Sequence, residues 1–558
     1  MFIRKKKSPH SKKTAVQLVK NERRDGKVKQ TIVRHFGAAE TEEDLQILMD
    51  LALRLKIDME TESQPSLFDT ETTMDQIRST RPKTEDEPLN VDLRHLVEEE
   101  RVKVGIHQIF GHIFEKIGFQ KVIHDSYRKK KSLKLMRDIV MTRIDRPQSK
   151  LSSVATLKKS YGIKTHINSI YRMMDLLDDA AIERIQQSCY DYTFGLLGEK
   201  LDVIFYDCTT LYFESFIEDD LKRNGYSKDG KFNQAQVLLA LMVTREGLPI
   251  GYEVFPGATF EGHTLTNALE KLHQKYKIDK LVFVADSAML SQENITLLES
   301  MGQPYIVAAR LKNLPKKLTK KILDKSQYKV LETQDDKAEI PITYMETFLD
   351  CETKKLIVTH NPKRAAKDEH DRLKAIVQLK KRLGKSSNPK ILLNNYGYKK
   401  YLTIKGETEL SINDEKIAQA SAWDGLHGII TNIQNAPPHE LLSHYHGLWQ
   451  VEETFRISKH NLRMRPIFHW TPSRIKSHIA ICFMALTCIR TLEFMVKVQY
   501  KKLSPEVIRK ALSELETSVL HDTSTDRHYV LPSKCSLDAK KIYQILGLRW
   551  QSTPYRLN

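Results

Sequence analysis

Residues Tyr445 to Lys459 read YHGLWQVEETFRISK and have the pattern of an amphipathic helix. The apolar side chains recur at steps of three and four residues: Leu448, Val451 and Phe455. Residues seven apart return to nearly the same side of an α-helix, because two turns take about 7.2 residues. Tyr445, Glu452 and Lys459 are therefore expected on one face, with Glu453 rotated about 100° away. This favours Glu452 as a functional carboxylate, and a surface helix with solvated charges is the alternative.

Two upstream aspartates occur at apolar runs that are typical of buried strands. Asp207 lies in LDVIFYDCTTLYFES, and Asp286 follows the run VFVA. The β-branched and aromatic residues of both segments favour strands. A carboxylate at such a position is costly to bury unless it is paired or bound to a metal. Either aspartate alone has a structural interpretation as a cap, and the joint pattern is more specific.

The order of the predicted elements indicates an α/β fold with an RNase H-like core. From residue 198 the chain predicts the order β-β-β-α-β-α-β over these segments: 201–215, two strands in 235–255 with a turn at Glu246-Gly247, 264–276, 282–285, 287–300 and 304–310. The first and fourth strands are neighbours in this fold, which would bring Asp207 beside Asp286. A late helix packed on the sheet would then add Glu452.

The interval between Asp286 and Glu452 is too long for an ordinary connection, so we expect an inserted module with short alternating strands. Residues 93–197 have helical periodicity and many basic side chains, for which DNA recognition and a plain helical bundle are both open interpretations. The predicted division of the chain is a basic β-hairpin plus helix at 1–60, a polar linker at 61–92, a helical DNA-binding domain at 93–197, the first part of the core at 198–310, a mostly β insertion at 311–432, the last part of the core at 433–500 and a helical C-terminal segment at 501–558.

The composition points to a polyanionic partner. The chain has 89 Lys and Arg against 71 Asp and Glu, a formal net charge of +18, and nucleic acid is the first candidate for such a field. The most apolar stretch, which begins at Ile479, is interrupted by Arg490 and Glu493, so we expect a buried helix rather than a membrane span. The N-terminal MFIRKKK lacks the apolar region of a secretory signal, which predicts a cytoplasmic location. The six cysteines have no metal-binding spacing and are expected to be buried thiols.

Asp207, Asp286 and Glu452 together would offer hard oxygen ligands, which suit Mg²⁺, with Mn²⁺ as a possible substitute. Two such ions about 3.5–4 Å apart activate an attacking water or 3′-hydroxyl and stabilise the leaving oxygen of a phosphodiester. Nucleases, polymerases and transposases use this chemistry. The three acids are therefore predicted to be both catalytic and metal-binding.

The chain resembles the DDE transposases of the IS4 superfamily, and in particular the IS1634-like branch. The most specific element is the signature Y-(2)-R-(3)-E-(6)-K, seen here as Tyr445, Leu448, Glu452 and Lys459. Leu448 stands in place of the signature arginine. YDCTTLYFE and VADSAM look like the two aspartate motifs of the family. The resemblance extends from the N-terminal hairpin to about His478.

This resemblance implies a Mg²⁺-dependent enzyme that excises and inserts an insertion sequence by hydrolysis and strand transfer at its ends. It implies double-stranded DNA as partner, both transposon ends and target, and a homodimer that brings two ends together in the bacterial cytoplasm, associated with the nucleoid. The residues expected to contact DNA are Tyr445, Lys459, Trp449, Arg456, Arg463 and Arg465. Trp423 and His427 are both candidates for stacking on a flipped base.

Two other classes of protein stay open at the level of sequence. A catalytically inactive or domesticated transposase-derived protein would keep the fold and the positive charge and bind DNA without cutting it. A metal-dependent nuclease would cut without joining ends to a target. The presence of all three carboxylates favours an active enzyme.

Overall fold

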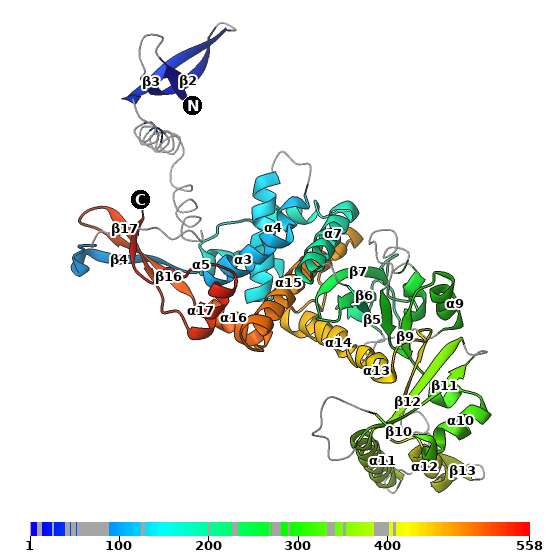
Figure 1. Cartoon of the computed structure of the whole chain (residues 1–558). Coiled ribbons are helices and arrows are strands. Elements are labelled where there is room, and N and C mark those ends of the chain that lie inside the picture. The colour runs from blue at the N-terminus through cyan, green and yellow to red at the C-terminus, as the bar shows by residue number, and fades with distance from the viewer. Residues whose placement is uncertain are drawn as a thin grey trace.

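The protein has a mixed α/β architecture (Figure 1). The computed structural model describes residues 2–7, 14–24, 27–39, 45, 49, 52, 89–123, 129–198, 201–225, 233–266, 269, 281–287, 291–331, 341–349, 353–383, 401–405 and 409–557. The expected linker at 61–92 lies almost wholly outside these residues, as do most of the helix predicted after the N-terminal hairpin and of the one predicted at 264–276.

The main sheet contains the predicted meander and the strand after it. In the described part of the chain its strand order is β10-β11-β12-β15-β9-β8-β5-β6-β7. The strands of its first part are β5 (Val203–Tyr212), β6 (Gln236–Thr244), β7 (Pro249–Pro256), β8 (Val282–Ala285) and β9 (Tyr305–Ala308). β6 pairs antiparallel with β5 and β7, whereas β8 pairs parallel with β5 and β9. The prediction that the first and fourth strands are neighbours is therefore confirmed.

Both faces of this sheet are covered, which explains why its central strands read as continuous apolar runs. Side chains alternate between the two faces of a strand. Accordingly, Val203 and Phe205 of β5 belong to one buried cluster, and Ile204 and Tyr206 belong to another. Helices α7 (Asp179–Leu196), α14 (Trp449–Arg456) and α15 (Pro472–Gln499) pack on the first of these faces.

The segment at 311–432 differs from the expected separate β module. Its strands β10 (Lys329–Val330), β11 (Thr343–Leu349), β12 (Lys354–His360) and β15 (Leu426–Thr431) extend the main sheet, because β15 pairs antiparallel with β9. The segment also contains α10 (Lys316–Leu323), α11 (Pro362–Leu383), α12 (Asp414–Ser421) and the small hairpin β13–β14 (Leu402–Lys405, Glu409–Ile412). It is therefore mixed α/β. Pairing with β9 satisfies backbone groups that an exposed sheet edge would leave open.

The helical character predicted for 93–197 is confirmed for most of that region. Its helices are α3 (Gly105–Ile117), α4 (Lys129–Asp145), α5 (Lys150–Tyr161), α6 (Ile167–Met174) and α7. The N-terminal hairpin is also confirmed, as β2 (Thr14–Arg24) and β3 (Lys27–Ala39), and β1 (Phe2–Lys7) adds a third strand to it.

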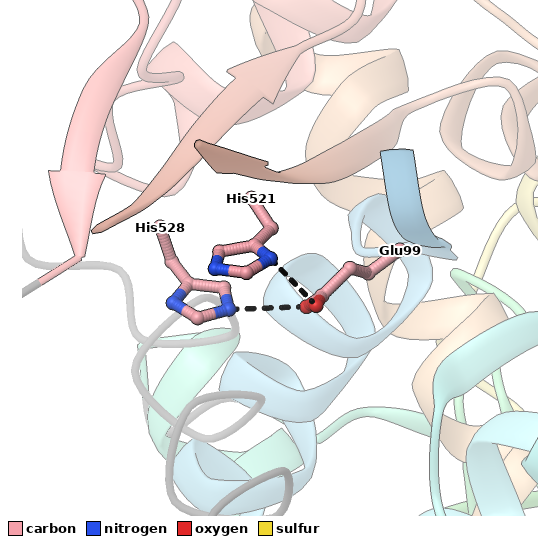
Figure 2. Close-up of side chains that lie close together, drawn as sticks. All are labelled: Glu99, His521 and His528. Atoms are coloured by element: carbon pink, nitrogen blue, oxygen red, sulfur yellow. Dashed lines mark hydrogen bonds and ion pairs between the residues drawn. The ribbon is translucent and has the colours of Figure 1, made fainter. Parts of the chain in front are cut away.

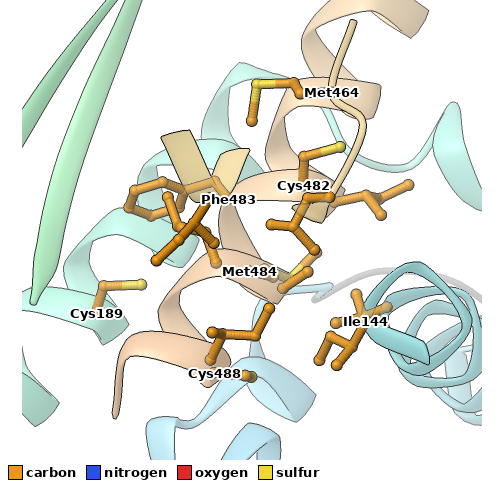
Figure 3. Close-up of a cluster of buried hydrophobic side chains, with 14 of the residues drawn as sticks. Ile144, Cys189, Met464, Cys482, Phe483, Met484 and Cys488 are labelled. Carbon is orange, nitrogen blue, oxygen red and sulfur yellow. The ribbon is translucent and has the colours of Figure 1, made fainter. Parts of the chain in front are cut away.

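The core of the helical region is α15, the helix predicted at the most apolar stretch. It is long and apolar enough to span a membrane by length and composition, but 83% of its most apolar window is buried inside the protein. Figure 3 shows Cys482, Phe483, Met484 and Cys488 of α15 packed among other buried side chains. The expectation of a buried helix is confirmed. Buried thiols are also found at Cys189 and Cys208, whereas Cys535 is half-buried and Cys351 lies outside the described residues.

The C-terminal segment is not only helical, which corrects the prediction for 501–558. Helices α16 (Pro505–Ser513) and α17 (Leu537–Ile545) are joined by strands β16 (Glu516–Asp522) and β17 (Arg527–Pro532), and β18 (Tyr555–Leu557) follows. These strands form a sheet with β4 (Leu96–Lys103), which begins the region predicted as helical. Neither β4 nor β16 has a buried face unless the two strands are paired. The local periodicity of the sequence therefore did not reveal that they pair.

The helix expected over 445–459 is divided in the structure. α13 (Pro438–His446) ends before Gly447, α14 begins at Trp449, and η9 (Ile457–Asn461) is a π-helical turn. The reason is a close approach to the sheet, because a Cβ atom on Gly447 would overlap the Phe205 ring of β5. Around this point backbone hydrogen bonds span three residues, as in a 3₁₀-helix, instead of four. They run from Leu448 N to Tyr445 O at 3.0 Å and from Val451 N to Leu448 O at 3.1 Å.

The substitution Gly447→Ala tests this contact. We expect it to lower the free energy of unfolding by about 1–3 kcal/mol, because the added methyl group overpacks the junction between α13, α14 and β5. Chemical denaturation of both proteins measures the difference. Gly195→Ala in α7 is the matched control, since nothing lies within 4 Å of its Cβ position, and it should be neutral or slightly stabilising. Equal stability of the Gly447 variant and the wild type would contradict the proposed close packing.

Candidate functional site

Asp207, within β5, and Asp286, directly after β8, lie at the same level of two adjacent parallel strands. Tyr206 of β5 is in register with Ala285 of β8, and each aspartate is the next residue along its own chain segment. Strand side chains alternate, so Asp207 is on the same face as Phe205, the side on which Gly447 packs. The parallel register therefore brings the two predicted carboxylates to one edge of the sheet, below the junction of α13 and α14.

Local hydrogen bonds orient both aspartates. Asp207 Oδ1 accepts a hydrogen bond from Cys208 N at 2.7 Å, and Asp286 Oδ1 accepts one from Ser287 N at 2.5 Å. Arg310, directly after β9, donates from Nη2 to the Ser287 carbonyl oxygen at 2.8 Å. Asp286 is exposed and Asp207 is half-buried. Each carboxylate is thus oriented by the backbone N–H group of the residue that follows it.

Glu452 and Glu453 of α14 have different environments. The Glu453 carboxylate pairs with Arg456 through two hydrogen bonds, at 2.7 Å from Nε and 2.6 Å from Nη2. The Arg456 guanidinium lowers the pKa of Glu453 below its usual range. Glu452, by contrast, is exposed on the face toward Tyr445. The preference for Glu452 over its neighbour is consistent with this difference, and Arg456 is already engaged by Glu453.

Tyr445, at the end of α13, lies within electrostatic reach of the three predicted carboxylates. Burial raises the pKa of the Tyr445 hydroxyl, and the negative charges of Asp286, Glu452 and Asp207 raise it further. At neutral pH this phenol keeps its proton and is a hydrogen-bond donor.

The donor set fits a hard divalent cation. Asp207, Asp286 and Glu452 offer carboxylate oxygens, the ligands that Mg²⁺ and Mn²⁺ prefer. These three carboxylates are not closely grouped. Among the described residues, one group of three acidic, histidine or cysteine ligand atoms lies within 4.8 Å of one another, and that group is elsewhere in the protein. An open set suits an ion that takes its other ligands from water and substrate oxygens.

The predicted cationic residues lie beyond α14. Lys459 is half-buried within the π-helical turn η9, Arg463 is exposed with φ of 45°, and the Arg465 guanidinium lies 5.5 Å from the centre of the Tyr212 ring. Trp449 is half exposed, with Lys502 Nζ 6.0 Å from its ring centre. π-helical turns inside helices often occur at functional sites.

Buried basic residues support the backbone between Leu462 and Met464. Arg143 Nη1 donates to Leu462 O at 3.3 Å, and His478 Nε2 lies 3.1 Å from Met464 O. Burial lowers the pKa of His478 well below its usual range, so the ring is neutral and its Nδ1 can accept from Lys150 Nζ at 3.4 Å. Arg143 and Lys150 are themselves buried, so they support this backbone from inside the protein.

Two cations near the carboxylates were missed from the sequence. Leu448, which replaces the signature arginine, is buried in the core and offers no charge. Arg364, exposed in the first turn of α11, lies close enough to Tyr445 to oppose the rise of its pKa. Arg310 is the other, through its bond to Ser287. Arg310 ends the predicted strand at 304–310, and Arg364 lies in the segment predicted as a mostly β insertion. Neither pattern indicated that these side chains lie near the carboxylates.

A cavity of about 470 Å³ lies beside this site. Trp423 and His427, the two base-stacking candidates, both line it. The His427 ring packs on Tyr445 with the ring centres 5.0 Å apart, and burial, followed by nearby Arg364, lowers the pKa of His427 to about 4. Trp423 is half-buried, with Lys312 Nζ 5.7 Å from its ring centre.

Comparisons with known proteins agree with the sequence patterns. Residues 198–488 match the family model described as "Transposase DDE domain", and residues 3–65 match "IS1634 family transposase, N-terminal domain". No curated protein matches the chain. Among solved structures, the chain is similar to a piggyBac transposase synaptic complex with hairpin DNA, with 9% identity, a TM-score of 0.37, and coverage of 73% of this chain and 76% of that chain. It is also similar to a Mos1 transposase paired-end complex with left transposon end, with 12% identity, a TM-score of 0.14, and coverage of 46% and 71%.

Binding of Mn²⁺, followed by electron paramagnetic resonance, tests the carboxylate site. We expect Asp286→Asn and Glu452→Gln each to weaken Mn²⁺ binding by about tenfold or more, because each removes a charged oxygen ligand. Glu453→Gln is the matched control, since that carboxylate is held by Arg456, and its affinity should equal that of the wild type. Equal Mn²⁺ affinity in all four proteins would refute the site.

Proposed function

The chain belongs to the DDE transposases and carries the N-terminal domain of the IS1634 family, and from this premise we propose that it is an active DNA transposase. It cuts DNA at the ends of an insertion sequence and joins the freed 3′ ends to target DNA. The reaction is phosphodiester hydrolysis followed by strand transfer.

One observation carries this proposal: the parallel register of β5 and β8 places Asp207 and Asp286 side by side, and the helix that carries Glu452 packs on β5. A protein that only binds DNA has no use for three carboxylates next to one another, because they repel phosphates. The order of strands around them, β7-β6-β5-β8-β9, supports the further inference of an RNase H-like core. In this core Asp207 and Asp286 come from neighbouring strands, and Glu452 comes from the late helix.

We assign the three carboxylates to the binding of Mg²⁺, with Mn²⁺ as a substitute. When bound, such ions activate the attacking hydroxyl and stabilise the leaving oxygen. The protein's own part is to hold the carboxylates in place, through the backbone bonds at Asp207 and Asp286 and the packing of α14 on β5. Arg310 donates a hydrogen bond to the Ser287 carbonyl oxygen and so holds the residue that follows Asp286 in position.

The surrounding cations are assigned to the DNA backbone. Lys459, Arg310 and Arg364 would contact phosphates near the cut, and Arg364 would supply the positive charge that Leu448 does not. Tyr445, protonated at neutral pH, would donate a hydrogen bond to a phosphate oxygen. The exposed Arg456 and Arg463 and the half-exposed Trp449 extend this surface, with Arg465 beside them.

Trp423 is our candidate for stacking on an extruded base. The cavity is large enough for a nucleobase, and it is lined by both Trp423 and Lys312, whose Nζ lies 5.7 Å from the centre of the Trp423 ring. His427 is the weaker candidate, because its ring is already packed on Tyr445. Base stacking on an aromatic ring is worth about 1–3 kcal/mol.

The wider assembly follows from the same assignment. Double-stranded DNA is the partner, as transposon ends and as target, and a homodimer would hold two ends together. Residues 93–197 and the basic N-terminal sheet are assigned to DNA recognition. Activity in the bacterial cytoplasm, in association with the nucleoid, stays a prediction, as does the division of the chain at residues 60, 92, 197, 310, 432 and 500.

Cleavage of duplexes that carry the terminal repeats bordering the gene tests the enzyme assignment. With Mg²⁺ present we expect nicking at the repeat end by the wild type, and a loss of at least about 100-fold in Asp207→Ala and Glu452→Gln, because each removes a group positioned for the reaction. Glu453→Gln should retain activity. Sequencing gels measure the nick and its position.

The outcomes separate the competing classes of protein. Tight DNA binding without nicking by the wild type would identify an inactive or domesticated DNA-binding protein. Nicking without joining of 3′ ends to a target plasmid would identify a nuclease. Nicking that survives Asp207→Ala would remove the three carboxylates from the mechanism.

The role of Arg364 is tested by DNA affinity as a function of salt. We expect Arg364→Ala to weaken binding and to reduce the slope of log K against log salt by about 0.9, the value for one phosphate contact on duplex DNA. Lys363→Ala removes an equal charge from the residue directly before Arg364, which is also exposed. This variant should change the slope less. Identical slopes for the two variants would argue against a specific contact by Arg364.

A further inference from the structure

A second group of potential metal ligands lies in the sheet that joins the start of the helical region to the C-terminal segment. Glu99 on β4, His521 on β16 and His528 on β17 place one ligand atom each within 4.8 Å of one another (Figure 2). Figure 1 shows this sheet on the other side of α3 from the strands that carry Asp207 and Asp286. The cluster contains imidazole nitrogen, whereas the catalytic set offers only oxygen.

The spacing of these atoms is that of a first coordination sphere. His528 Nε2 lies 3.1 Å from Glu99 Oε2, and His521 Nδ1 lies 3.5 Å from Glu99 Oε1. Ligand atoms of a tetrahedral zinc ion lie about 3.3 Å apart, because each is about 2.0–2.1 Å from the metal. Only small side-chain adjustments would therefore be needed to admit the ion.

The backbone directs all three side chains to the same point. His521 and His528 are directly paired across β16 and β17, and their rings are stacked with centres 4.6 Å apart and planes at 12°. On β4, Glu98 pairs with Leu520 and Glu100 pairs with Val519, so Glu99 is the extra residue of a β-bulge. A bulge redirects a side chain that regular pairing would place elsewhere.

Asp526 supplies the outer partner that metal-bound histidines usually have. Its Oδ1 lies 2.9 Å from His521 Nε2, so that nitrogen donates to Asp526 and Nδ1 keeps a lone pair toward Glu99. Asp526 has φ of 53° in the turn between β16 and β17, a conformation that is uncommon outside glycine. Asp522 braces the same turn by accepting bonds from Ser524 and Thr525.

We propose that Glu99, His521 and His528 form a binding site for a divalent transition metal ion, with Zn²⁺ as the best chemical match. Two imidazoles and one carboxylate leave a fourth position for water or another ligand. The side chains of His521 and Glu99 are 24% and 47% exposed, so an ion can enter from solvent. Because β4 and β16 are distant in sequence, the bound ion would fasten the C-terminal strands to the start of the helical region.

Zinc titration of the full-length protein, by calorimetry with Zn²⁺ alone as the probe, tests this site. We expect one equivalent bound with micromolar or tighter affinity in the wild type and its loss in Glu99→Gln and in His528→Gln. Asp526→Asn should weaken binding by about tenfold or more without abolishing it, because Asp526 positions His521. His95→Gln, a histidine near the same sheet but outside the cluster, should bind as the wild type does.

A variant of the predicted carboxylate site distinguishes zinc bound there from zinc bound at Glu99, His521 and His528. Asp207→Asn should leave the equivalent that depends on His528 in place, and failure of the transposase assignment would not affect that result. Equal stoichiometry and affinity in the wild type and His528→Gln would overturn the proposal. Should the cluster variants misfold, Co²⁺ bound to the wild type decides the matter, since a visible spectrum without bands of nitrogen-ligated, four-coordinate cobalt would also overturn it.

Discussion

A single buried guanidinium joins the helix that carries Glu452 to the main sheet and to the core helix. Arg490 of α15 donates from Nε to the Gly247 carbonyl oxygen at 2.8 Å, from Nη2 to Gln450 Oε1 at 2.9 Å, and pairs with Glu493 at 2.5 Å. These bonds connect the turn between β6 and β7, the helix that carries Glu452, and the core helix. A buried cation is stable only with such partners, so the geometry of the three elements is interdependent.

This dependence explains how an open, exposed site is kept in place. Asp207 lies within β5 and Asp286 directly after β8, beside the parallel pairing of these two strands, and Glu452 comes from a helix packed on β5 and β6. The segment between β9 and α13 extends the same sheet and brings Arg364 toward Tyr445. The positive charges near the carboxylates therefore come from a segment that the family signature does not include.

The opposite end of the protein follows a different principle. Strands from residues 96–103 and 516–532 pair with one another, and a bulge, a cross-strand histidine pair and a braced turn converge on Glu99. Short strands bury little apolar surface, so added fastening is of most value there. A metal ion at this place would act on the assembly of the chain rather than on its chemistry.

Local sequence determined the elements whose side-chain period and residue types are self-sufficient: the meander, the strand before Asp286 and the buried helix α15. The motifs indicated the family by resemblance, through the signature from Tyr445 to Lys459 and the two aspartate motifs, and the family models agree. Tertiary structure decided the rest. The break at Gly447 depends on the ring of Phe205. The pairing of β9 with β15, and of β4 with β16, joins segments that are distant in the sequence. The positions of Arg310 and Arg364 depend on the pairing of β9 with β15. Periodicity specifies which face of a strand is buried but not which strand lies beside it.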